Sequence, residues 1–172
     1  AVNFDKLDHF NGVYIRALPQ AELAKRIKPH FDQAGLKADE AALLRITPII
    51  QGRIGTLDES VDMAGFFFRP TVEPTPESLI PKGMTASAAL AALQKARSLL
   101  ESLPNLEHST TEPPMRKLAE DLGLKPGQLF GILRVAVTGQ TVSPPLFETI
   151  ALLDKSLVFE RLAHAERLLS QT

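Results

Sequence analysis

The sequence predicts an all-α fold made of two helical pieces. Three observations support this prediction. Apolar residues recur at the three- and four-residue spacing of a helix face, helix-capping residues precede several of these runs, and four prolines gather between residues 70 and 81. Because so many prolines fit neither a helix nor a central strand, residues 70–81 are predicted to be a linker between two domains.

The first helix expected in the amino-terminal half follows Pro19, since proline is tolerated in the first turn of a helix. It ends at Gly35, and its apolar residues at helical spacing are Leu23, Ile27 and Phe31. Asp39 is the expected cap of a second helix with Pro48 near its end.

Residues 56–59 then fit a capping box, in which the threonine oxygen and the glutamate satisfy free backbone donors reciprocally. This box predicts a short helix that runs towards the three phenylalanines at residues 66–68.

In the carboxy-terminal half, Thr85 is the expected cap of a long helix that stops near Pro104. The further helices are expected at residues 112–122, 126–137, 144–153 and 155–170. Their short connections favour a compact bundle. Residues 133–142 contain enough β-branched side chains that periodicity alone does not exclude a strand there.

Composition narrows the class of protein. The 172 residues are 44% hydrophobic, which is enough for one or two domains with a proper core. No cysteine is present, so disulfides and thiolate zinc sites are excluded, and no apolar stretch approaches the roughly 20 residues that span a bilayer. The chain does not begin with methionine, and we expect it to be part of something longer.

The charge balance argues against a protein that coats nucleic acid. There are 19 basic and 20 acidic side chains, for a formal net charge of −1. Phosphate contacts alone therefore give little attraction. If this chain binds RNA, a few placed residues must do so, or a missing domain must supply the rest.

No pattern of catalytic chemistry is present. The sequence has no Gly-rich phosphate loop, no metal-binding histidine pair and no nucleophile motif, and its four histidines are scattered. We therefore expect no catalytic residue, no metal site and no cofactor in this chain by itself.

Residues 117–134 imitate a DNA-binding helix-turn-helix. The small, turn and anchoring residues of that pattern are Ala119, Gly123 and Leu129. A helix that reads bases needs several polar side chains near its start, and only Lys125 and Gln128 qualify. The packing pattern favours an ordinary helix pair in a bundle.

The turn at residues 138–145 also suits recognition of an unstacked RNA loop. Ser143 as N-cap and Pro144 as first helical residue would set the entry to a helix beside the ligand. Arg134 would offer a planar fork of donors to a base edge or a phosphate. From the residues alone, a salt bridge or a charge at the helix C-terminus is the favoured explanation of Arg134.

Two segments resemble bacterial glutamyl-tRNA synthetases. Residues 133–148 (LRVAVTGQTVSPPLFE) resemble the anticodon-binding end of those enzymes, and residues 6–16 (KLDHFNGVYIR) resemble the part just after their catalytic core. The resemblance implies that residues 1–69 form a helical domain following the stem-contact region. It also implies that residues 82–172 form the compact anticodon-binding helical bundle.

The same resemblance implies anticodon-binding residues. Arg53 is similar to the family arginine that reads the third anticodon base, and Arg134 matches an arginine near the first two. The loop and helix start that cradle the first two bases correspond to Ser143, Pro144 and Leu146. Pro145 stands where relatives have glycine, and it has no N–H with which to make a backbone contact.

The function expected from this resemblance is recognition of the anticodon loop of tRNA(Glu) by the carboxy-terminal part of a cytoplasmic, monomeric glutamate–tRNA ligase. ATP, Mg²⁺ and the ligation chemistry would belong to a missing amino-terminal class I catalytic domain. The expected partners are tRNA(Glu) and that domain, with no DNA and no membrane. The alternatives are a helix-turn-helix DNA-binding module and a helical protein-interaction scaffold.

Overall fold

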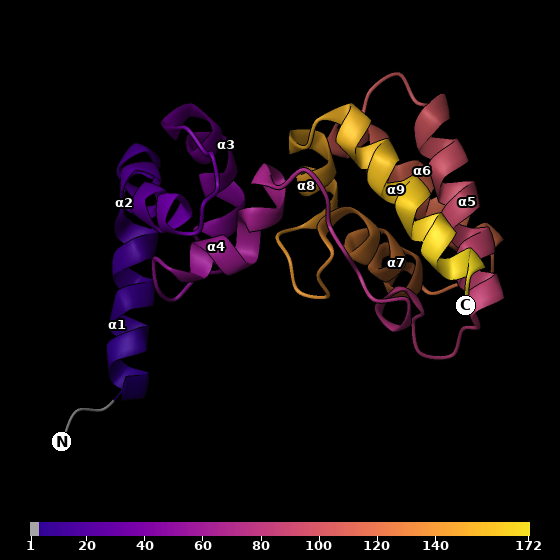
Figure 1. Cartoon of the computed structure of the whole chain (residues 1–172), viewed down its shortest axis with the longest axis horizontal. Helices are drawn as coiled ribbons and strands as arrows, with labels where there is room; N and C mark the ends of the chain where they lie inside the picture. The colour runs from indigo at the N-terminus through magenta and orange to yellow at the C-terminus, as the bar shows by residue number, and fades with distance from the viewer. Residues whose placement is uncertain (1–3) are drawn as a thin grey trace. The chain divides into compact units, whose positions relative to one another are not determined.

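The computed structural model describes residues 4–172, with side chains from residue 11 onwards. Within these residues the chain forms nine α-helices, two short 3-10 helices and no β-strand, which confirms the all-α prediction. The chain divides into two compact units, of which the first ends at Arg69 and the second runs from Pro70 to Thr172 (Figure 1). Residues 1–3 lie outside the described part. So do the side chains of residues 6–10, which belong to the segment 6–16 that resembles the synthetases.

The first unit is built on a pair of packed helices, α2 and α3. As predicted, α2 begins after Pro19 and ends before Gly35, which takes the left-handed conformation with a φ of 76°. The apolar stripe of α2 is fully buried, and Phe31 meets Phe68 edge-on at 5.4 Å between ring centroids. The elements of this unit are α1 (Phe4–Ala17), α2 (Gln20–Gln33), α3 (Glu40–Ile50), α4 (Glu59–Ala64) and the 3-10 helix η1 (Gly65–Phe68).

Two predicted caps of this unit have different outcomes. Asp39 caps α3 as predicted, and its Oδ1 accepts the N–H of Ala42 at 2.7 Å. The capping box at residues 56–59 is wrong. The carboxylate of Glu59 instead accepts the N–H of Gly55 at 2.8 Å, and a hydrogen bond from the Thr56 side chain lowers the pKa of Asp58. Helix α4 begins only at Glu59, so Glu59 is its first residue and does not take the third position that a capping box needs.

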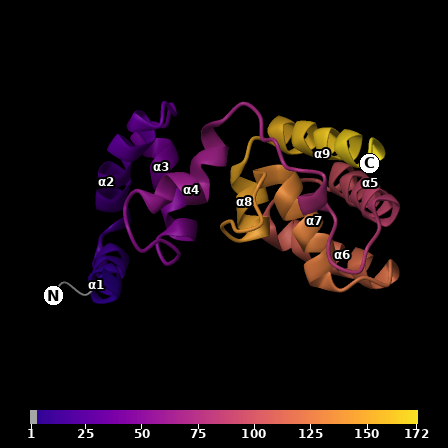
Figure 2. The same ribbon diagram turned by 60° about the horizontal axis from the view of Figure 1, so that its bottom comes forward.

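The second unit is a helical bundle in which α5 and α9 lie side by side and α7 packs against both (Figures 1 and 2). Thr85 caps α5 as predicted, since its Oγ1 accepts the N–H of Ala88 at 3.1 Å. The buried face of α5 carries several alanines, which lets neighbouring helices approach closely. The α-helices are α5 (Ala86–Ser102), α6 (His108–Asp121), α7 (Pro126–Thr138), α8 (Leu146–Leu152) and α9 (Lys155–Ser170).

The proline-rich segment at 70–81 is largely packed on the second unit. It contains the 3-10 helix η2 (Glu77–Leu79), which contacts α7. Val72, Pro74 and Leu79 are buried, whereas residues 69–71 are exposed. The prolines therefore prevent regular helix formation without leaving the whole segment loose.

Three details of the bundle differ from the sequence expectations. The strand left open at residues 133–142 is not formed, because α7 continues to Thr138 and ends at Gly139. Helix α6 begins at His108, a turn before the predicted start at residue 112, with Pro113 and Pro114 inside it. Helix α8 begins at Leu146, two residues after the predicted start.

Candidate nucleic-acid interface

The candidate site is the loop of residues 139–145 between α7 and α8, which stands off the bundle in Figure 1. The loop starts at Gly139, which ends α7 in the left-handed conformation with a φ of 74°. A Cβ at this position would lie 3.1 Å from the Cβ of Val72. Glycine therefore allows both the chain reversal and the close approach of the 70–73 segment.

Arg134, in the last turns of α7, joins the two sides of this loop. Its Nη1 donates to Ser143 Oγ at 2.6 Å and to the Pro144 carbonyl oxygen at 3.0 Å. We call the set of Arg134, Ser143 and Pro144 the arginine clamp. Because the guanidinium is planar and rigid, its hydrogen bonds fix the far side of the loop relative to α7.

The predicted N-cap role of Ser143 is wrong. The residue that precedes Leu146 and caps α8 is Pro145, and no side chain makes a capping hydrogen bond there. Pro144 is itself followed by a proline, which disfavours the helical conformation and delays the start of α8. Ser143 therefore faces Arg134, and its hydroxyl also lies 2.8 Å from the Pro144 carbonyl oxygen.

The remaining predicted loop residues form the base of the loop. Leu146 is only 4% exposed, and Pro144 is buried as well. Their side chains anchor the loop in the bundle core. The exposed tip of the loop is formed by Thr141 and Val142.

Two further residues brace α7 beneath the clamp. The hydroxyl of Thr138 donates to the Arg134 carbonyl oxygen at 2.6 Å and accepts the N–H of Gln140 at 3.0 Å. Arg161 of α9 is 3% exposed and donates from Nη1 to the Val137 carbonyl oxygen at 2.8 Å, and its burial lowers the pKa of its guanidinium. The bond from Arg161 satisfies one of the carbonyl groups that the end of a helix leaves without an intrahelical partner. Sequence reasoning did not single out either residue.

Arg53 lies in the first unit, in the turn that follows α3. Its side chain is exposed, and its Nη1 is 3.4 Å from the Ile49 carbonyl oxygen. The turn is held in place by Gln51, whose Nε2 donates to two carbonyl oxygens at the end of α1, at 2.9 and 2.7 Å. The structure thus brings Arg134, Ser143, Pro144 and Leu146 together in one unit and places Arg53 in the other.

The helix-turn-helix pattern has the predicted packing, but one of its two candidate side chains for contacting bases is already hydrogen-bonded within the fold. Ala119 and Leu129 are fully buried, and Gly123 turns the chain with a φ of 71°. Gln128, one of two polar candidates at the start of α7, is occupied within the fold. Its Oε1 accepts the N–H of Lys125 at 2.9 Å, and its Nε2 donates to the Lys82 carbonyl oxygen at 3.2 Å.

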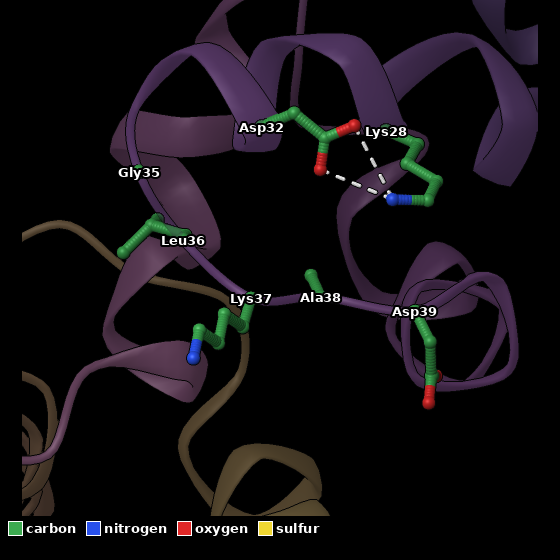
Figure 3. A pocket seen from close by; sticks show the side chains of 7 residues that line it. All are labelled: Lys28, Asp32, Gly35, Leu36, Lys37, Ala38 and Asp39. Atoms are coloured by element: carbon green, nitrogen blue, oxygen red, sulfur yellow. Dashed lines mark hydrogen bonds and ion pairs between the residues drawn. The ribbon is translucent and has the colours of Figure 1, made fainter.

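A recess on the first unit lies at the end of α2 and has a volume of about 570 Å³ (Figure 3). Lys28 and Asp32 on its rim pair with each other at 3.0 Å, so their charges are satisfied within the fold. Among the described residues, no group of three His, Asp or Glu side chains could hold a metal ion. In that same part of the chain, no helix is long and apolar enough to cross a membrane.

Comparison with known proteins identifies the class of this protein. Residues 22–166 match the family described as the anticodon binding domain. The chain therefore belongs to the anticodon-binding domain family. The match covers most of both units, including Arg53, the arginine clamp and Leu146.

The similar proteins are glutamate–tRNA ligases. The chain is 47% identical over 169 residues to the glutamate–tRNA ligase of Roseiflexus castenholzii, covering 95% of this chain and 33% of that protein. The corresponding enzyme of Dehalococcoides mccartyi is 39% identical over 174 residues, covering 98% of this chain and 36% of that protein. The chain thus spans about a third of the length of these relatives.

A solved structure shares the fold. A crystal structure of a glutamate tRNA ligase from Elizabethkingia meningosepticum matches with a TM-score of 0.82 and 19% identity, covering 96% of this chain and 32% of that one. The chain is homologous to the anticodon-binding part of glutamate–tRNA ligases.

Proposed function

We propose that this chain recognises the anticodon loop of a glutamate tRNA as the carboxy-terminal part of a glutamate–tRNA ligase. The observation that carries the proposal is the arginine clamp at an exposed loop, within a chain of the anticodon-binding domain family. The longer protein would supply a class I catalytic domain with its ATP and Mg²⁺ and would act in the cytoplasm as a monomer. We assign no catalytic residue to the chain itself.

The loop of residues 139–145 suits an unstacked RNA strand, because proteins read such strands by holding bases apart and hydrogen-bonding their edges. In this proposal Arg134 and Ser143 present polar groups to the first two anticodon bases. Pro144 and Leu146 contribute by anchoring the loop from the core. Arg53 in the first unit reads the third base.

The net charge of −1 and the few proposed contacts together bear on how the affinity for RNA should depend on salt. Counterion release grows with the number of phosphates that cationic side chains neutralise, and the proposed contacts are to bases, so the affinity should depend weakly on salt. Specific contacts from a few preorganised residues would then carry most of the binding free energy. The hydrogen bonds of Arg134 support this preorganisation.

The proposal is tested by measuring the affinity of the 172-residue chain for an isolated tRNA(Glu) anticodon stem-loop and for duplex DNA of equal charge. We expect preference for the stem-loop, and we expect Arg134→Ala to weaken stem-loop binding by about tenfold or more, as for a lost base contact worth roughly 1–3 kcal/mol. Arg167→Ala is the matched control, since Arg167 is an exposed arginine of α9. Preference for the duplex would favour the DNA-binding alternative, and equal losses in the two variants would remove Arg134 from the site.

A further inference from the structure

The loop that carries the arginine clamp also exposes a large apolar side chain. Val142 is 71% exposed, the highest value among the large exposed hydrophobic residues of the described chain. Single apolar residues on a surface are common and need no explanation by themselves. What distinguishes Val142 is that hydrogen bonds hold its own carbonyl oxygen and the two residues that follow it.

On the amino-terminal side, the amide side chain of Gln140 donates to the Val142 carbonyl oxygen at 2.9 Å. The backbone of Gln140 is in turn fixed through its N–H to the buried hydroxyl of Thr138. Val142 is therefore tied through Gln140 to the end of α7.

On the carboxy-terminal side, Val142 is followed directly by Ser143, whose hydroxyl Arg134 holds at 2.6 Å. The next residue, Pro144, is buried. The apolar side chain is thus held out to solvent at a fixed point, one residue from the clamp. A rigid loop loses little conformational entropy when a ligand covers such a side chain.

We propose that Val142 is a further specificity residue, whose side chain packs against the face of one unstacked base of the bound anticodon loop. This inference rests on the proposed function. Every base has an apolar face that protein side chains can cover, and the polar groups of the clamp lie directly beside Val142 to hydrogen-bond the edge of that base or its neighbour. The contact would remove both the valine and the base face from water.

The test uses the 172-residue chain and the tRNA(Glu) anticodon stem-loop. Val142→Ala removes two carbon atoms from the contact, and it should weaken binding by about three- to tenfold without lowering the stability of the chain. Val142→Phe should bind at least as tightly as the unchanged chain, because an aromatic ring offers a larger stacking surface. Leu152→Ala is the matched control: Leu152 is another exposed apolar residue of this unit, at 38%, and this variant should bind normally.

A second measurement separates a base contact from any other effect. Three stem-loops, each lacking one anticodon base, are titrated with the unchanged chain and with Val142→Ala. If Val142 packs against a base, one of the three RNAs binds both proteins equally, because that contact is already absent. Normal binding by Val142→Ala, or a loss that persists with all three RNAs, overturns the inference. If Arg134→Ala still weakens binding when the Val142 test fails, the proposed function stands and only the role of Val142 is wrong. If the unchanged chain binds no stem-loop, both the proposed function and the role of Val142 are wrong.

Discussion

In the proposed function, the exposed side chain of Arg53 reads the third anticodon base. The glutamate and glutamine anticodons differ at the third base, cytosine against guanine. An arginine that reads this base separates the two tRNAs. The Nη1 of Arg53 lies 3.4 Å from the Ile49 carbonyl oxygen, which is a long hydrogen bond. The fold therefore holds the exposed guanidinium only weakly at this contact.

We therefore expect Arg53→Gln in the complete ligase to narrow the ratio of kcat/KM for the glutamate and glutamine tRNAs. Loss of a well-placed base contact costs on the order of 1–3 kcal/mol of discrimination. The stability of the chain should change by less than about 0.5 kcal/mol, because the residue is exposed.

The matched control is Arg45→Gln, since Arg45 is an exposed arginine of α3, the helix that precedes the turn of Arg53. Steady-state kinetics with both tRNAs measure the ratio for each variant. An unchanged ratio for Arg53→Gln would make Arg53 a surface charge or a helix-terminal partner, the interpretation that the local sequence favours without the family resemblance.

At the scale of one loop, Gly139 ends α7 and is the position that Val72 approaches closely. Its left-handed φ of 74° strains any residue with a Cβ, and the added atom would also press on Val72. Gly139→Ala should therefore lower the free energy of unfolding by about 1–3 kcal/mol.

Gly123 provides the comparison, because its φ is 71° and nothing lies within 4 Å of an added Cβ. Gly123→Ala should show the conformational strain without the contact and should cost less than Gly139→Ala. Urea denaturation measures both variants. Equal losses would mean that the approach of Val72 contributes nothing to the stability of the loop.

The caps show which elements local sequence can predict. Asp39 and Thr85 cap their helices as predicted, because a cap depends on a side chain and a backbone N–H only three residues away. The expected cap at Ser143 is wrong for two reasons. The proline pair that follows it delays the start of α8, and Arg134 holds the Ser143 hydroxyl. The box at residues 56–59 is wrong because α4 begins later than the pattern indicates, and Glu59 accepts the N–H of Gly55 instead.

At the scale of the whole chain, limited proteolysis should cut first at residues 69–71. These three consecutive residues are exposed and lie outside any helix, whereas Val72, Pro74 and Leu79 pack on the second unit. Exposed backbone without hydrogen-bonded structure is the preferred site of nicking. A protease of broad specificity is needed, because Arg69 is followed by proline.

Mass spectrometry of the fragments locates the first cut. We expect two resistant pieces that correspond to the two units. A first cut inside residues 126–153 would show that the braced loop between α7 and α8 is less protected than its hydrogen bonds indicate.

The sequence by itself determined the helical class, the order of most helices and several of their ends. Those features follow from apolar spacing and from capping residues, which act over a few neighbouring positions. The family resemblance assigned Arg53 and Arg134 to contacts with anticodon bases. A local sequence pattern cannot make that assignment, because an arginine that contacts a base looks the same in it as any surface arginine. It did not indicate how either side chain is held.

Only the tertiary structure decided what surrounds the candidate site. The burial of Leu146, the exposure of Val142 and the support of α7 by Arg161 depend on how α7, α8 and α9 pack together. The bond from Arg134 to Ser143 likewise needs the loop to fold back on its helix. Such contacts join residues through space, and a pattern of neighbouring residues carries no information about them.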